Sequence, residues 1–202
     1  MKNKFKKIGF AGLDHLGLNY IMATAAKGFS VIGYHNNVAK ISELKKGKIL
    51  IHEPGLEKLL LKHRKKINFS TNPKSLSDCK IIYITLDVNT NKQGKSDLDS
   101  IKKIIKDVTK ISNKSTILVI LSQVPPGFTR KIKWNKKKLF YQVETLVFGN
   151  ALNRALYPER LIIGCSNSNY LIDNNLKKLL KKFKCPILPM RYESAEFAKI
   201  SI

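Results

Sequence analysis

Short apolar runs rich in β-branched residues alternate along this chain with amphipathic stretches, and this alternation is typical of parallel βαβ units. We expect eight strands, near residues 7–12, 30–35, 67–70, 80–86, 116–122, 139–143, 160–164 and 186–189. Helices are expected between them, at about 15–27, 38–46, 55–62, 98–112, 127–133 and 175–183, with a last one opening near Ser194. The pattern predicts the α/β fold class, with a doubly wound, mostly parallel sheet and helices on both faces.

The longest irregular stretch is the loop 87–95, which follows the fourth expected strand. Open parallel sheets bind their ligands at the carboxyl ends of the strands, so this loop is a candidate ligand-facing segment. An ordinary polar connection explains its composition equally well.

The segment from Gly12 to Gly17 ends the first expected strand and opens the first helix, which is the context of a dinucleotide-binding fingerprint in a Rossmann-type domain. Gly12 suits the tight turn, and Gly17 suits close packing of the helix on the sheet. Asp14 replaces the middle glycine, at which the backbone normally approaches the cofactor's pyrophosphate. A carboxylate there adds bulk and like-charge repulsion, so we expect NAD to bind weakly or not at all.

A second cofactor feature also departs from the usual pattern. An acidic residue at the end of the second strand normally accepts hydrogen bonds from the adenosine ribose, but His35 stands at this position. Neutral imidazole cannot replace the two acceptor oxygens of a carboxylate. A surface histidine at the entry of the next helix is an equally good interpretation of His35.

Composition narrows the class of protein. The chain has 202 residues, of which 43% are hydrophobic, enough for a substantial core. It has no apolar stretch of membrane-spanning length and no signal peptide, so we expect a soluble cytoplasmic protein without a membrane partner. Cys79, Cys165 and Cys185 are odd in number and widely spaced, which argues against both a disulfide framework and a metal site.

The formal net charge of +24 raises the alternative of nucleic-acid binding. Almost all of this charge comes from lysines scattered over the polar segments, whereas recognition of phosphates and bases favours arginine. A lysine-rich solvated surface is the preferred interpretation, and nucleic acid is an unlikely partner.

Several further motifs agree in order and spacing, and on them the chain resembles the UDP-glucose/GDP-mannose dehydrogenase family over nearly its whole length. Residues 52–56 (His-Glu-Pro-Gly-Leu) resemble the family's Tyr-Glu-Pro-Gly-Leu, and residues 121–128 resemble its Lys-Ser-Thr-Val-Pro-Val-Gly-Thr segment. Residues 142–149 correspond to the Asn-Pro-Glu-Phe-Leu-x-Glu-Gly loop, and residues 157–164 to the Asn-Pro-Asp-Arg strand. Residues 193–199 resemble the start of the long central helix that follows the cofactor domain.

The resemblance implies an NAD-dependent enzyme that oxidises the primary alcohol of a nucleotide sugar to a carboxylate through a thiohemiacetal on a cysteine. It implies that Glu144 is the general base of the hydrolytic step, although a strand-end glutamate without this task is an equal alternative. The residues that it places at the cofactor are Gly12, Leu13, His15, Leu16, Gly17, His35, Lys40, Val88 and Gln123. Those that it places at the sugar substrate are Thr145, Leu146, Val147 and Phe148.

The family's catalytic cysteine lies in a Gly-Gly-x-Cys-Phe element beyond the central helix, and none of the three cysteines here has such surroundings. We therefore expect residues 1–190 to form the dinucleotide-binding domain and 191–202 to begin the inter-domain helix of a truncated relative. One hypothesis is a nucleotide-sugar dehydrogenase or its N-terminal piece, and the other is an inactive Rossmann module that binds a nucleotide or a partner. An apolar helix face with Phe197 and Ile200 indicates a homo-oligomer or a complementary chain.

Overall fold

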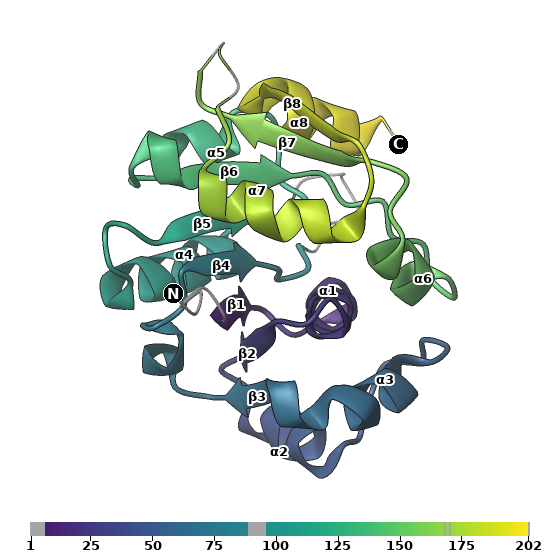
Figure 1. Ribbon diagram of the computed structural model, residues 1–202. Coiled ribbons are helices and arrows are strands. Elements are labelled where there is room, and N and C mark those ends of the chain that lie inside the picture. Colours follow the sequence, from purple (N-terminus) through teal and green to yellow (C-terminus); the bar gives the residue numbers. More distant parts are fainter. Residues whose placement is uncertain (1–6, 89–95, 168, 170, 202) are drawn as a thin grey trace, which may run out of the picture.

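In the computed structural model, which describes residues 7–88, 96–167, 169 and 171–201, the chain forms one eight-stranded sheet in the order β3-β2-β1-β4-β5-β6-β7-β8 (Figure 1). Neighbouring strands pair in parallel, except for β6 and β7, which are antiparallel. The expected doubly wound, mostly parallel sheet is confirmed, and every expected strand is present. The strands are β1 (Lys7–Ala11), β2 (Ser30–Tyr34), β3 (Ile67–Ser70), β4 (Ile81–Ile84), β5 (Ile117–Ile120), β6 (Leu139–Gln142), β7 (Leu161–Cys165) and β8 (Ile187–Arg191).

Helices cover both faces of the sheet (Figure 1). One face carries α1 (His15–Ala26), α2 (Val38–Lys46), α3 (Leu56–His63), α6 (Ala151–Leu156) and α7 (Asn174–Leu180). The other carries α4 (Asp99–Ile111), α5 (Phe128–Lys131) and α8 (Tyr192–Ile200). The short helix α6 is the one α-helix among the described residues that the sequence pattern did not predict.

The alternation of side chains along each strand divides the core into two halves. In β4, Ile81 and Tyr83 pack under α1 and its neighbours, whereas Ile82 and Ile84 pack under α4 and α8. All four residues are buried because helices cover both faces, which is why the strands read as continuous apolar runs.

The order of the strands reverses at β1 and β4, where such sheets open a crevice for a ligand. Two glycines shape the turn between β1 and α1. Gly12 has φ +107, and a Cβ there would lie 2.4 Å from the backbone nitrogen of Leu86. A Cβ on Gly17 would lie 2.1 Å from the backbone oxygen of Gly12. Neither position has room for a side chain, so the backbone of the turn directly contacts α1 and the residues 85–86 that follow β4.

The last helix, α8, packs against the sheet. The Tyr192 hydroxyl donates to the backbone oxygen of Leu139 at 2.6 Å, and Arg130 forms an ion pair with Glu193. The buried carboxylate of Glu196 accepts the backbone N–H of Thr129 at 2.8 Å and also that of Gly127, just before α5. The expected boundary at residue 191 falls at the start of this helix, and its role as an inter-domain helix stays a prediction.

None of the helices formed by the described residues combines the length and the apolar character that a membrane crossing requires.

Candidate functional site

A cavity of about 200 Å³ opens at the carboxyl edge of the sheet, beside the turn between β1 and α1. We call it the His15 cleft. Residues from four segments line it: the start of α1, the loops after β4 and β5, and the segment after β6. They are His15, Leu16, Asp87, Val88, Gln123, Glu144, Leu146 and Phe148. The fold thus brings predicted cofactor residues and predicted substrate residues together around one space.

His15 occupies the centre of a buried network. Its Nε2 lies 2.9 Å from Oε2 of Glu53, and its ring stacks on Phe148 with the ring centroids 4.0 Å apart. The Glu53 carboxylate also accepts the backbone N–H groups of Gly149 at 3.1 Å and Ala151 at 2.8 Å. One side chain from the loop before α3 therefore holds both the first residue of α1 and the segment that leads into α6.

Burial of the Glu53 carboxyl acts to raise its pKa, but the hydrogen bonds from His15, Gly149 and Ala151 outweigh burial and hold this pKa below its ordinary value. Glu53 is thus a carboxylate at neutral pH and can only accept hydrogen bonds. The sequence motif 52–56 contained Glu53, but the side chain was not predicted as a site residue, because its partners lie far away in the sequence.

Glu144, the predicted general base, lies at the edge of the His15 cleft with its side chain largely enclosed. It forms an ion pair with Lys199 of α8, and its second oxygen accepts the backbone N–H of Leu146 at 2.7 Å. Lys199 was not predicted as a site residue, although it ends the motif 193–199. Glu196 and Lys199 lie one turn apart on α8, and the first binds the start of α5 while the second pairs with Glu144.

The carboxylate of Asp14, which we expect to repel a pyrophosphate, has partners of its own. It forms an ion pair with Lys40 of α2 and lies 3.8 Å from Nε2 of His35. The backbone N–H of Asp87 lies 3.4 Å from its other oxygen. The two departures from the fingerprint, Asp14 and His35, therefore meet around Lys40 at the carboxyl ends of β1, β2 and β4.

His35 offers no acceptor to a ribose hydroxyl in this arrangement. Its Nδ1 accepts the backbone N–H of Asn37 at 3.0 Å, so the neutral ring carries its hydrogen on Nε2, which points toward Asp14. Burial lowers the pKa of His35, and the neighbouring charge of Lys40 lowers it further against the opposing effect of Asp14. The ring therefore stays neutral at pH 7, and Asp14 is the carboxylate nearest to it.

The remaining predicted residues lie around these two groups. Leu13 is fully buried in the core under α1, so it can meet a ligand only through its backbone. His35 lines a separate cavity of about 280 Å³ with Tyr34 and Leu86. Thr145 lines a third, near Arg154, and Val147 is largely exposed. The structure thus leaves Thr145 and Val147 outside the lining of the His15 cleft.

Asp87 lines the cleft but was not predicted there. Burial and the nearby charge of Asp14 raise its pKa above the ordinary value. Its position directly after the expected strand 80–86 was the available signal. Of the candidate ligand-facing loop 87–95, only the first two residues are described, and residues 89–95 lie outside the described part of the chain.

The three cysteines lie away from the His15 cleft. Burial raises the pKa of Cys79 to about 12 and that of Cys165 to about 11, and it also raises the pKa of Cys185. All three are therefore thiols at neutral pH. Within the described ranges, no group of three or more His, Cys, Asp or Glu side chains is arranged to hold a metal ion.

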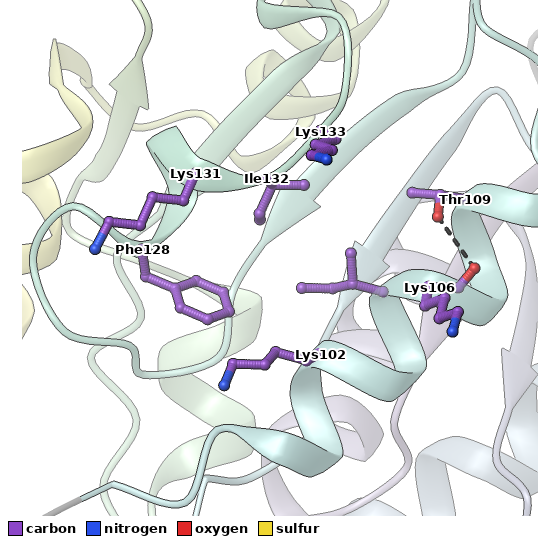
Figure 2. A pocket seen from close by; sticks show the side chains of 8 residues that line it. Lys102, Lys106, Thr109, Phe128, Lys131, Ile132 and Lys133 are labelled. Carbon is purple, nitrogen blue, oxygen red and sulfur yellow. Dashed lines mark hydrogen bonds between the residues drawn. The ribbon is translucent and has the colours of Figure 1, made fainter.

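A larger hollow of about 400 Å³ lies elsewhere, between α4 and α5. Figure 2 shows Lys102 and Lys106 on one side of it and Phe128 and Lys131 on the other. It contains none of the predicted site residues. The convergence of polar groups, and not cavity volume, selects the His15 cleft as the candidate site.

Comparison with known proteins gives the same family as the motifs. Residues 6–184 match the model of the NAD-binding domain of the UDP-glucose/GDP-mannose dehydrogenase family. The chain is 29% identical over 203 residues to a putative UDP-glucose 6-dehydrogenase, YtcA, of Bacillus subtilis, covering 96% of this chain and 47% of that protein. It is 31% identical over 169 residues to a UDP-glucose 6-dehydrogenase of Rickettsia bellii, covering 79% of this chain and 39% of that protein.

Solved structures share the fold. The GDP-mannose dehydrogenase of Pseudomonas aeruginosa, in a ternary complex, superimposes with a TM-score of 0.85 at 23% identity over 96% of this chain and 48% of that one. The UDP-D-ManNAc dehydrogenase of Pyrococcus horikoshii gives 0.87 at 22% identity over 96% and 49%. The chain spans about half the length of these relatives.

Proposed function

This chain belongs to the UDP-glucose/GDP-mannose dehydrogenase family, and we propose that it is the cofactor-binding part of a nucleotide-sugar dehydrogenase, with the His15 cleft as its reaction site. The domain that it contains is the family's NAD-binding domain. We propose in addition how the ligands lie: NAD binds along the carboxyl ends of β2, β1 and β4, and residues 144–148 bind the sugar.

One observation carries the proposal. Seven residues that the motifs place at the cofactor, the substrate or the catalytic step converge on a single cavity, although they come from four segments spread over residues 15–148. A parallel sheet with this strand order opens its crevice at the same edge. Agreement between the fold's ligand edge and the family's site residues favours a retained site.

The residues present fit NAD at several points. The closely packed turn between Gly12 and Gly17 brings backbone N–H groups at the start of α1 to the crevice, where a pyrophosphate is stabilised. Lys40 supplies a positive charge at the same edge once its bond to Asp14 opens. Bound NAD would accept a hydride from the sugar carbon, and Glu144 would take a proton from water in the hydrolytic step.

Lys199 is suited to keep the Glu144 carboxylate in place, because the two groups form an ion pair within a largely enclosed pocket. The substrate class, a UDP-glucose-type sugar, follows from the names of the relatives and is part of the proposal. The alternative expected from the sequence, an inactive module, has no separate support in the comparisons.

The test is a titration of the ¹⁵N-labelled chain with NAD, followed by NMR. We expect shift changes at His15, Val88 and Gln123, and we expect Gln123→Trp, a bulky change at an exposed position, to abolish them. Lys106→Trp, which fills the hollow between α4 and α5, is the matched control and should leave NAD binding unchanged. Shift changes that cluster around α4, or none at millimolar NAD, would contradict the proposal.

A further inference from the structure

Glu53 joins segments that are far apart in the chain. Glu53 is only 6% exposed. Its carboxylate accepts hydrogen bonds from His15 at the start of α1 and from the backbone N–H groups of Gly149 and Ala151. These partners are 38, 96 and 98 residues away. His15 lines the His15 cleft, and so does Phe148, which directly precedes Gly149. In the proposed function, His15 belongs to the cofactor side and the segment 148–151 to the substrate side.

The local backbone fixes Glu53 in this position. Gly55, with φ +80, begins α3 in the left-handed region, and the backbone N–H of Leu56 bonds back to the oxygen of Glu53 at 3.2 Å. At the other end of the link, Asn150 makes no side-chain cap for α6. The first turn of α6 therefore depends on Glu53 for an acceptor, and a six-residue helix has little stability of its own.

The stacked rings close the network. Phe148 rests on the His15 ring at 4.0 Å while 75% of Phe148 is exposed at the mouth of the cleft. A shift of His15 would change both the contact with Phe148 and the bond to Glu53. The segment 148–151 therefore has two physical connections to the first residue of α1.

We propose that Glu53 is a positioning residue that couples the two halves of the cleft, so that a dinucleotide bound at the turn between β1 and α1 orders the substrate-side segment 148–151. This inference rests on the proposed function for the identity of the ligand, NAD. Binding that fixes His15 also fixes its carboxylate partner, and the same carboxylate holds the amides of Gly149 and Ala151. By linkage, a ligand on the substrate side favours NAD binding to the same degree.

The experiment measures hydrogen exchange at the amides of Gly149 and Ala151 with and without NAD. In the wild type, we expect saturating NAD to slow exchange at both amides at least about fivefold, the lower end of typical couplings. In Glu53→Gln, the single carbonyl oxygen cannot accept from all three donors, so NAD should bind without slowing exchange. Glu43→Gln, a surface carboxylate paired with Lys46 in its own helix, is the control and should behave as the wild type.

Equal slowing in the wild type and in Glu53→Gln would overturn the inference, as would NAD binding to the wild type without any slowing. If Glu53→Gln does not fold, His15→Ala removes the hydrogen bond between His15 and Glu53. It leaves in place the hydrogen bonds that the backbone N–H groups of Gly149 and Ala151 donate to Glu53. With NAD at a concentration that titration shows to saturate His15→Ala, exchange at Gly149 and Ala151 should then be insensitive to NAD, and a retained response would contradict the coupling.

Failure of NAD to bind the wild type would refute the proposed function. The positioning of His15 by Glu53 can then be tested in the protein without ligand. Stacking on Phe148 should shift the ring protons of His15 upfield, and Glu53→Gln should remove much of this shift by releasing the imidazole. An unchanged His15 spectrum in Glu53→Gln would show that Glu53 does not position the ring.

Discussion

Asp14 shows how one residue changes meaning once its neighbours are known. As a carboxylate in place of a glycine, it predicts repulsion of a pyrophosphate. In the fold it is the partner of Lys40, so it also removes the cation that could bind the phosphate. Both effects act against NAD, one directly and the other through Lys40. As the N-cap residue of α1 it makes no side-chain capping bond, so it contributes little to the helix start.

We therefore predict that Asp14→Gly binds NAD more tightly than the wild type, by roughly tenfold or about 1.4 kcal/mol. The reason is that the substitution frees Lys40 and removes the bulk and charge at the turn. Asp14→Asn keeps the bulk and removes the charge, so it should recover part of the gain. Calorimetric titration measures all three proteins. Tight binding by the wild type with no gain on substitution would show that Asp14 is not the obstacle.

At the scale of elements, α7 depends on a charged cap. Asp173 accepts the backbone N–H of Asn175 at 2.7 Å and forms an ion pair with Lys138, which precedes β6. Burial acts to raise the pKa of Asp173, but the bonds from Lys138 and Asn175 outweigh it and hold this pKa below its ordinary value. The unfolded chain therefore binds more protons in acid, and the stability that Asp173 contributes is present at neutral pH and lost as the pH falls through its lowered pKa.

We predict that Asp173→Ala lowers the free energy of unfolding by about 1–2 kcal/mol at pH 7, the usual effect of losing an N-cap. Asp173→Asn keeps an oxygen acceptor for the cap but loses the charge, so its deficit should be smaller. This deficit should begin to shrink near the ordinary aspartate pKa and should vanish below the lowered pKa of Asp173. Urea unfolding at neutral and acidic pH measures both. A deficit of Asp173→Asn that is independent of pH would contradict the role given to Lys138.

At the same scale, ion pairs and hydrogen bonds hold α8 against the candidate site and against α5. Its Lys199 reaches Glu144, while Glu193 and Glu196 attach the helix to α5. Phe197 and Ile200 on this helix remain largely exposed, as the expected apolar face requires. Their contact with a second chain stays a prediction.

On the scale of the whole molecule, the chain has a cofactor edge and a candidate base but no thiol at the cleft. Covalent catalysis by a cysteine needs a thiolate beside the substrate. Cys79, Cys165 and Cys185 lie elsewhere, and burial keeps them protonated. We therefore predict that the 202 residues alone produce no sustained NADH from NAD and UDP-glucose.

Absorbance of NADH, followed with purified protein and a panel of UDP- and GDP-sugars, checks this. Glu144→Gln is the accompanying variant. Sustained turnover by the wild type that Glu144→Gln abolishes would mean that the chain is a complete enzyme by itself and that a group other than a cleft cysteine supports the reaction.

The sequence by itself determined the architecture and the edge of the sheet that carries the candidate site. Both follow from local signals: runs of apolar residues long enough to fix each buried strand, helical periodicity between them, and glycines where a side chain has no room. The family motifs then placed Glu144, His15 and Gln123 at that edge. The prediction of the fold succeeded because its signals depend on residues that are close together in the chain, and the roles of Glu144, His15 and Gln123 stay predictions.

Only the tertiary structure decided which charges meet. Asp14 and Lys40 are 26 residues apart, and Glu53 and Ala151 are 98 residues apart, so no local pattern pairs them. The same reason explains why α6 was missed, since the acceptor for its first turn comes from Glu53. Lys199 reaches Glu144 only because α8 folds back onto β6 and β7. Charges pair through space, and the fold alone sets those distances.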